Sequence, residues 1–317
     1  MRVIFAGTPT VAVPSLDALV AAGFDVVAVL TREDAPLGRK RVMTPSPVAA
    51  RAAELDIEII RANRIDGPVI EQIAALRADV AAIVAYGGLV PSAALDVPVH
   101  GWINLHFSLL PAWRGAAPVQ HAVIAGDELT GASTFLLEAG LDTGPVYGTM
   151  TEAVRPSDTS GELLDRLSHS GAVLLVQTLA GVAAGRAEAV PQHGAVSLAP
   201  KLTIDDARVD WSQLALAVRR RINGVTPEPG AWTQLGDQRV KIGPVSLLTT
   251  SAAESSNPSD EGVNLAPGEV ALDGAAVLVG TGSTAVVLGN VQPAGKKNMR
   301  SQDWARGALQ QGELVFS

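Results

Sequence analysis

The sequence predicts an α/β protein in which a doubly wound, mostly parallel sheet is followed by a second, smaller β-barrel domain. In residues 1–207, continuous apolar runs of strand length alternate with helical segments, as in a parallel sheet covered on both faces. After Asp210-Trp211 the apolar runs become short and alternating, and turns rich in Gly, Asp and Pro separate them, which favours a small barrel. A length of 317 residues suits about two domains. We therefore expect domains at 1–207 and 208–317.

The first domain is expected to begin with a buried strand over 2–6, a turn at Gly7-Thr8-Pro9 and a helix to about Ala22. A helix should begin at Pro47, because Ser46 is a good N-cap and Pro favours the first helical position. Thr159 and Glu162 have capping-box spacing at the start of a long helix toward Gly185. The other expected elements are strands at 25–30, 57–60, 79–84, 101–105, 130–138 and 146–152, and a helix at 69–76.

The second domain should open with a helix that carries Arg219–Arg221. Gly280–Ala285 matches the dinucleotide-binding pattern G-x-G-x-x-A, but that site needs a helix next, and Val286–Leu288 is strand-like. We therefore interpret this match as a hairpin turn. Strands are expected at 231–235, 239–242, 275–279 and 284–288, with a surface loop at 251–267.

The net charge of −8 lies entirely in the first domain. Residues 1–207 hold 14 Lys and Arg against 22 Asp and Glu, whereas residues 208–317 hold 10 of each. A nucleic-acid partner would be repelled by the overall field and would have to use local basic clusters. Arg39-Lys40-Arg41 and Lys296-Lys297, with Arg300 nearby, are two such clusters, although each by itself is typical of a solvated charged loop.

Several classes of protein are disfavoured by composition. The chain has no cysteine, so it has neither disulfides nor a thiolate zinc site. No apolar run approaches the roughly 18 residues of a membrane span, and the N-terminus is expected to form a strand and not a signal peptide. We expect a cytoplasmic protein with no membrane contact. Nothing in the sequence demands a dimer, so a monomer is expected.

One histidine stands apart from the other four. His100, His106, His121, His169 and His193 show no metal-ligand spacing, so no metal is expected. Asn104 and His106, however, leave the same face of a strand, at the end where open α/β sheets bind ligands. An amide beside an imidazole can stabilise a carbonyl oxygen that becomes negative. From these residues alone, an active site and a capped strand end remain equal alternatives.

Asp142 is a candidate partner for His106. Asp142-Thr143-Gly144 is the triplet of the aspartic proteases, but those enzymes need two such carboxylates and the chain has one, in an α/β context. We therefore exclude a protease. A carboxylate hydrogen-bonded to His106 would raise the pKa of the imidazole and hold it as a donor.

These residues form an ordered series that resembles the formyltetrahydrofolate-dependent transformylases. The branch of that family that formylates methionyl-tRNA matches nearly the whole chain. The shared segments are Asn104-Leu105-His106, Ser108–Pro111, Arg114–Pro118 and Leu141–Gly144, together with Phe5–Pro9, Pro45–Val48, Val84–Gly87, Lys201–Trp211 and Pro293–Lys297.

The resemblance implies a Rossmann-like catalytic domain, an OB-type C-terminal barrel, and formyl transfer from 10-formyltetrahydrofolate to the α-amine of initiator methionyl-tRNA. It implies that Asn104, His106 and Asp142 are catalytic. It places the folate against Ser108, Leu109, Leu110 and Pro111. For the tRNA it implies the basic loop Arg39, Lys40 and Arg41, and Lys296 and Lys297 of the barrel.

Two positions depart from the family's pattern. Val11 stands where an aromatic residue near the methionine pocket is expected, and Lys40 replaces a small residue. The role of Arg114 stays open between folate, tRNA and a nearby carboxylate. Two other functions are weighed: a different folate-dependent transferase or hydrolase, against which residues 208–317 argue, and a tRNA-binding protein with an inactive catalytic domain, against which the intact trio argues.

Overall fold

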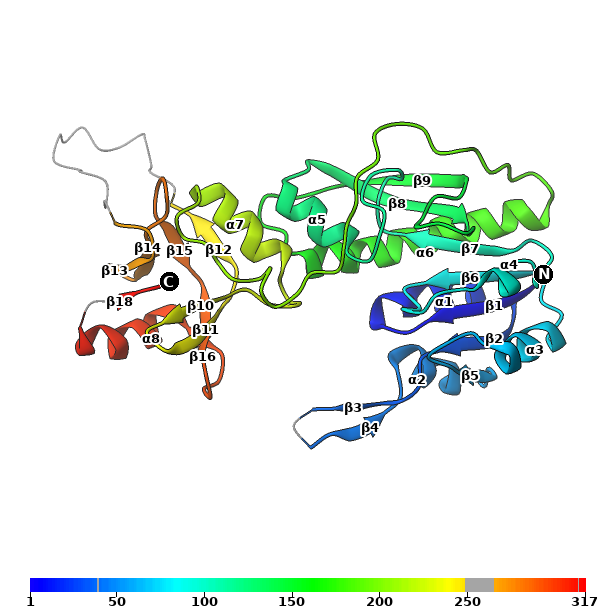
Figure 1. Ribbon diagram of the computed structural model, residues 1–317, viewed down its shortest axis with the longest axis horizontal. Coiled ribbons are helices and arrows are strands. Elements are labelled where there is room, and N and C mark those ends of the chain that lie inside the picture. Colours follow the sequence, from blue (N-terminus) through cyan, green and yellow to red (C-terminus); the bar gives the residue numbers. More distant parts are fainter. Residues whose placement is uncertain (39, 249–264, 313) are drawn as a thin grey trace. The chain divides into compact units, whose positions relative to one another are not determined.

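The computed structural model in Figure 1 describes residues 1–38, 40–248, 265–312 and 314–317. The chain divides into two compact units. The first unit comprises Met1–Pro118, Leu129–Ala153 and Leu164–Ala199, and the second comprises Val119–Glu128, Val154–Leu163 and Pro200–Ser317. Within the described residues, no helix combines the length and the apolar character that crossing a bilayer requires.

The first unit is built on a seven-stranded sheet with the strand order β5-β2-β1-β6-β7-β8-β9. Strands β5, β2, β1, β6 and β7 are parallel to one another, and β8 and β9 continue the sheet antiparallel. The prediction of a mostly parallel sheet is thus confirmed. The strands are β1 (Arg2–Gly7), β2 (Asp25–Thr31), β5 (Ile59–Arg61), β6 (Val80–Val84), β7 (Trp102–His106), β8 (Leu129–Leu136) and β9 (Val146–Ala153).

Both faces of this sheet are covered. Ile4 and Ala6 of β1 belong to a buried cluster with Ile73 and Trp102 on one face. Successive side chains of a strand point to opposite faces. Val3 and Phe5 therefore lie on the other face, and they too are fully buried. The continuous apolar runs in the sequence reflect this burial on both sides.

Helices connect the strands, and their starts follow the expected capping chemistry. Ser46 Oγ accepts a hydrogen bond from Ala49 N at 3.0 Å, and Thr159 and Glu162 exchange the two bonds of a capping box at 2.9 and 3.2 Å. Both cap predictions are confirmed. The helices are η1 (Thr10–Ala12), α1 (Val13–Ala21), α2 (Pro47–Glu54), α3 (Gly67–Ala75), α4 (Ser92–Leu95), α5 (Pro118–Ala125) and α6 (Ser160–Ala183).

A small hairpin was not predicted. Strands β3 (Ala35–Leu37) and β4 (Val42–Thr44) pair antiparallel with each other and with no other described strand, where the sequence indicated a polar loop. Leu37, Val42 and Met43 on this hairpin are 60–66% exposed. The hairpin carries no buried face, so the alternation that signals a strand is missing from its sequence.

The second unit contains two antiparallel sheets, one with strand order β10-β11-β16-β17 and one with order β12-β15-β14-β13-β18. Phe316 is stacked between Trp211 and Trp304 in its core, with ring centroids 5.6 and 5.5 Å apart. The elements are α7 (Ala215–Gly224), β10 (Trp232–Leu235), β11 (Gln238–Ile242), β12 (Val245–Leu247), β13 (Glu269–Asp273), β14 (Ala276–Val279), β15 (Val286–Leu288), β16 (Asn290–Pro293), β17 (Met299–Arg300), α8 (Ser301–Ala308), η2 (Leu309–Gln311) and β18 (Leu314–Val315).

The glycine pattern at Gly280–Ala285 connects two antiparallel strands, β14 and β15. No helix follows it, and Thr281 Oγ1 donates to the carbonyl of Thr284 at 2.6 Å within the turn. The hairpin-turn interpretation is confirmed. Of the surface loop expected at 251–267, residues 251–264 lie outside the described residues.

Candidate active site

Strand β7 brings Asn104 and His106 to the carboxyl edge of the sheet. β7 lies between β6 and β8, and His106 is opposite Ser133 in the register with β8. Asn104 is half-buried. Its carboxamide has no hydrogen-bond partner among the residues that the structure describes, so it can donate to a ligand. Asn104 and His106 are therefore two residues apart on one strand, as expected, and their side chains leave the same face of it.

His106 is buried, and both of its ring nitrogens face acceptors. Nε2 lies 2.9 Å from the carbonyl oxygen of Trp113, and Nδ1 lies 3.7 Å from Asp142 Oδ2. A carbonyl oxygen can only accept, so Nε2 carries the proton in the first contact. Phe135 lies edge-on to the imidazole, with ring centroids 6.4 Å apart. Nδ1 is the nitrogen left for chemistry.

Burial lowers the pKa of His106 below its usual 6.5. The negative charge of Asp142 and the hydrogen bond to the Trp113 carbonyl both raise this pKa, but they do not offset the loss of solvent. The imidazole is therefore mainly neutral at pH 7. The expectation that Asp142 raises the pKa of His106 is confirmed for that one contribution. The net direction is set by burial, which sequence spacing does not reveal.

Asp142 lies in the loop between β8 and β9, close to His106 but not hydrogen-bonded to it. The distance of 3.7 Å is an ion-pair distance and exceeds that of a hydrogen bond. Asp142 Oδ2 instead accepts from the backbone N–H of Gly115 at 2.7 Å. The Asp142 backbone has φ +52°, in the left-handed region that non-glycine residues seldom adopt. Such a conformation has to be held by its surroundings.

The loop after β7 presents an apolar surface. Leu109 and Leu110 are half-buried, and the Leu110–Pro111 peptide bond is cis. Ser108 is fully buried, and its hydroxyl donates to the carbonyl of Ala112 at 2.6 Å. The Ser108 side chain therefore shapes the loop from within. Leu109 and Leu110 have the exposed surface that a ligand could contact.

Among the described residues, the guanidinium of Arg114 contacts a side-chain amide and not a carboxylate. Its Nε and Nη2 donate to Gln192 Oε1 at 3.1 and 2.6 Å. Gln192 Nε2 in turn donates to the backbone carbonyls of Asp142 and Gly144, each at 2.8 Å. Gln192 could not be predicted from the sequence, since the residues around it show no periodic pattern and its partners are 48–78 positions away.

The basic residues assigned to tRNA lie in two separate places. Lys40 and Arg41 are exposed at the tip of the β3–β4 hairpin, and Lys296 and Lys297 are exposed in the turn after β16. Arg39 lies outside the described residues. Val11 lines a cavity of about 450 Å³ between η1, α1 and α6, whose apolar lining includes Val13 and Ala172.

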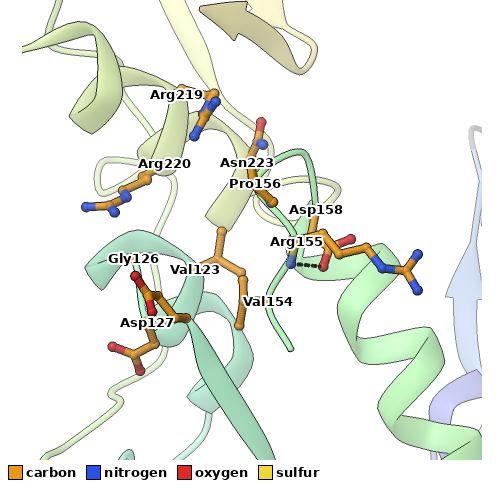
Figure 2. A pocket seen from close by; sticks show the side chains of 11 residues that line it. Val123, Gly126, Asp127, Val154, Arg155, Pro156, Asp158, Arg219, Arg220 and Asn223 are labelled. Carbon is orange, nitrogen blue, oxygen red and sulfur yellow. Dashed lines mark hydrogen bonds between the residues drawn. The ribbon is translucent and has the colours of Figure 1, made fainter. Parts of the chain in front are cut away.

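Another cavity, of about 190 Å³, lies in the second unit and is lined by α5, α7 and the segment after β9. Figure 2 shows that the guanidinium groups of Arg155, Arg219 and Arg220 point in different directions around it. The Arg220 guanidinium packs against Gly126, just beyond the C-terminal end of α5, where a positive charge is favourable. Burial, followed by the charge of Arg220, lowers the pKa of Arg219. The lining of this cavity includes an amide (Asn223) and carboxylates (Asp127 and Asp158), but it has no imidazole among the described residues.

Comparison with known families agrees with this geometry. Residues 1–179 match the formyl transferase family, and residues 201–309 match the formyl transferase C-terminal domain. In structure, the chain is similar to an N-formyltransferase from Helicobacter canadensis in complex with folinic acid and dTDP-3-aminofucose. The TM-score is 0.68 over 91% of this chain and 98% of that chain, at 16% identity, which supports the fold alone. The two family matches together define the chain as a formyl transferase.

Full-length relatives are more specific. The chain is 69% identical to a methionyl-tRNA formyltransferase of Arthrobacter sp. (strain FB24), over 100% of both sequences. It is 56% identical to that of Streptomyces coelicolor, over 99% of both. The solved methionyl-tRNA formyltransferase from Clostridium thermocellum has a TM-score of 0.58, at 14% identity, over 78% of this chain and 94% of that chain. The chain belongs to the methionyl-tRNA formyltransferase family.

Proposed function

We propose that Asn104, His106 and Asp142 transfer the formyl group of 10-formyltetrahydrofolate to the α-amino group of methionine on initiator tRNA. One observation carries this assignment. The half-buried Asn104 carboxamide has no hydrogen-bond partner among the described residues, and it lies two positions before His106, a buried imidazole that faces the carboxylate of Asp142. Such a set suits a reaction in which a carbonyl oxygen becomes negative while an amine loses a proton.

In the first step the amine nitrogen attacks the formyl carbon, and the carbonyl oxygen takes up the electron pair. The Asn104 amide donates to that oxygen, and each such donor is worth about 3 kcal/mol in comparable sites. Neutral His106 accepts the proton of the attacking amine at Nδ1. The imidazolium formed in this way faces Asp142 and stays bonded to the Trp113 carbonyl, so both contacts become stronger as the charge develops.

In the second step the tetrahedral intermediate collapses. The bond between the formyl carbon and N10 of the folate breaks, and N10 takes up the proton from His106. The products are formylmethionyl-tRNA and tetrahydrofolate, so atoms and charge balance without a covalent enzyme intermediate. Asp142 stabilises the transient imidazolium. Leu109 and Leu110 offer apolar surface to the folate, and the buried residues Ser108 and Pro111 shape the loop that carries them.

We further propose that residues 1–207, with the linker, form the catalytic domain, and that residues 208–317 are an OB-type tRNA-binding barrel. Its two antiparallel sheets support this assignment. Lys40, Arg41, Lys296 and Lys297, with Arg39, would neutralise phosphates of the tRNA, which an acidic protein can hold only through such local clusters. We place the enzyme in the cytoplasm, where initiator tRNA is charged and used, and we expect it to act as a monomer.

The decisive experiment incubates the protein with 10-formyltetrahydrofolate and methionyl-tRNA, and follows formylmethionine formation against folate release. Formylated tRNA in step with released tetrahydrofolate is the expected result. Folate release without formylation would indicate a hydrolase, and absence of both products would indicate an inactive tRNA-binding protein. Either of these outcomes overturns the assignment.

A His106→Ala variant tests the site itself. It should abolish turnover while tRNA affinity stays unchanged, because the imidazole is buried and has no phosphate to contact. His100→Ala is the matched control, since His100 is exposed and precedes the other end of β7. A loss of tRNA binding in the His106 variant, or full turnover, would contradict the catalytic role.

A further inference from the structure

The loop that carries Trp113, Arg114 and Gly115 is held by a distant segment of the same unit, residues 190–199. Arg114 N donates to the Ser197 carbonyl at 2.9 Å, and Ala199 N donates to the Arg114 carbonyl at 2.8 Å. The Trp113 N–H donates to Ser197 Oγ at 2.8 Å. At its other end the segment is paired with β9 through two backbone bonds between Val190 and Val146. The segment is thus anchored at both ends.

Within this segment, Gln192 uses its entire hydrogen-bonding capacity on the active site. Both Nε2 protons go to backbone carbonyls, those of Asp142 and Gly144, and Oε1 accepts two bonds from Arg114. The opposite amide orientation would set an oxygen against two carbonyls and an NH₂ group against a guanidinium. The orientation is therefore determined by the contacts.

These four bonds connect the two neighbours of His106. One side of the carboxamide fixes the backbone of Asp142, whose side chain lies 3.7 Å from His106 Nδ1. The other side fixes Arg114, which stands between Trp113, the partner of His106 Nε2, and Gly115, the donor to Asp142 Oδ2. Asp142 has φ +52° and needs outside support to keep that conformation.

We infer that Gln192 is a positioning residue for formyl transfer. Through its bonds to Arg114 and to the backbone of the Asp142 loop, Gln192 sets the distance between Asp142 and His106. The kinetic test of this role rests on the proposed function. The position of Asp142 relative to His106 can be tested without any substrate. Arg114 would then act as the cationic partner of the Gln192 carboxamide.

The discriminating variant is Gln192→Glu. Glutamate has the same shape and keeps an acceptor, now a charged one, for Arg114. It loses both donors and sets a carboxylate oxygen against the carbonyls of Asp142 and Gly144. A residue that only filled space or bound Arg114 would tolerate this change. A residue that positions Asp142 would not.

For Gln192→Glu and Gln192→Ala we expect kcat to fall by roughly 10- to 100-fold. A loss of this size is expected when catalytic groups are displaced by up to about 1 Å. KM for folate and for methionyl-tRNA should stay unchanged. Gln213→Ala is the control, because Gln213 Nε2 makes a comparable bond to Asp210 in the second unit. Unchanged kcat in the glutamate variant would overturn the inference.

A second readout separates this inference from the proposed function. The titration of His106 can be followed by NMR in the protein without substrate. With Asp142 displaced, His106 should lose part of the interaction that raises its pKa. Its titration should therefore move to lower pH in Gln192→Ala, which adds no charge, and stay in place in Gln213→Ala. An unmoved titration with a lowered melting temperature would show a merely structural role. If wild-type protein fails to formylate methionyl-tRNA, the proposed function fails while this titration still tests Gln192.

Discussion

Replacing Gly115 by alanine tests whether the close approach of two backbones sets the geometry of the active site. Gly115 has φ +125°, and a Cβ at this position would lie 2.7 Å from the carbonyl oxygen of Ala199. Van der Waals contact would require the loop to move by roughly 0.5 Å or more. The N–H of Gly115, which donates to Asp142 at 2.7 Å, would move with it.

The expected cost has two parts. The backbone strain of a non-glycine residue at such a φ is about 1–3 kcal/mol, which a folded domain of this size can tolerate. The catalytic cost follows from the displacement of Asp142 relative to His106, and a shift approaching 1 Å lowers kcat by about 100-fold. We therefore expect folded protein, a lowered melting temperature and a kcat reduced by roughly 10- to 100-fold.

The assay measures kcat for methionyl-tRNA formylation beside a thermal unfolding curve. Gly185→Ala is the matched control, because Gly185 also has a positive φ, +64°, but a Cβ there would meet nothing within 4 Å. The control should lose about 1–2 kcal/mol of stability and keep wild-type kcat. If Gly115→Ala is folded and turns over like wild type, the contact with Ala199 does not set the position of Asp142, and the reasoning fails.

Three further outcomes are expected. Asp142→Asn should lower kcat and move the acid limb of the pH profile of kcat/KM to lower pH. The reason is that Asp142 raises the pKa of His106, and neutral His106 is the proposed reactive form. An unshifted acid limb would argue against an interaction between Asp142 and His106. Replacing Lys40, Arg41, Lys296 and Lys297 by alanine should raise KM for tRNA and flatten its dependence on salt, with KM for folate as the internal control. Phe316→Ala should destabilise the second unit by about 3–5 kcal/mol in denaturant unfolding, since the ring is stacked between Trp211 and Trp304; a change below 1 kcal/mol would mean that the stack contributes little.

Much of the fold could be predicted because it rests on local patterns. The buried strands of the first unit are continuous apolar runs, and Ser46 and the Thr159–Glu162 pair mark their helices by side-chain chemistry alone. The β3–β4 hairpin escaped prediction, because its exposed strands bury no face and leave no periodic signal.

The proposed catalytic pair, Asn104 and His106, could be found because both residues lie on one strand. The remainder of the site depends on backbone groups and on long-range contacts. The Trp113 carbonyl and the Gly115 N–H have no sequence signature, since every residue carries such groups. Gln192 meets Arg114 only in the folded chain. The net direction of the His106 pKa depends on burial, which requires the complete structure.

The β3–β4 hairpin offers a way to detect ligand binding in solution by limited proteolysis. Its two short strands pair only with each other among the described strands, so opening the hairpin should cost little free energy. Lys40 and Arg41 are exposed between them and are substrates for trypsin. Limited proteolysis should therefore cut first at this tip, and a ligand that covers it should slow the cut. The rate of that single cleavage would report occupancy of the hairpin without any label on the protein or on the RNA.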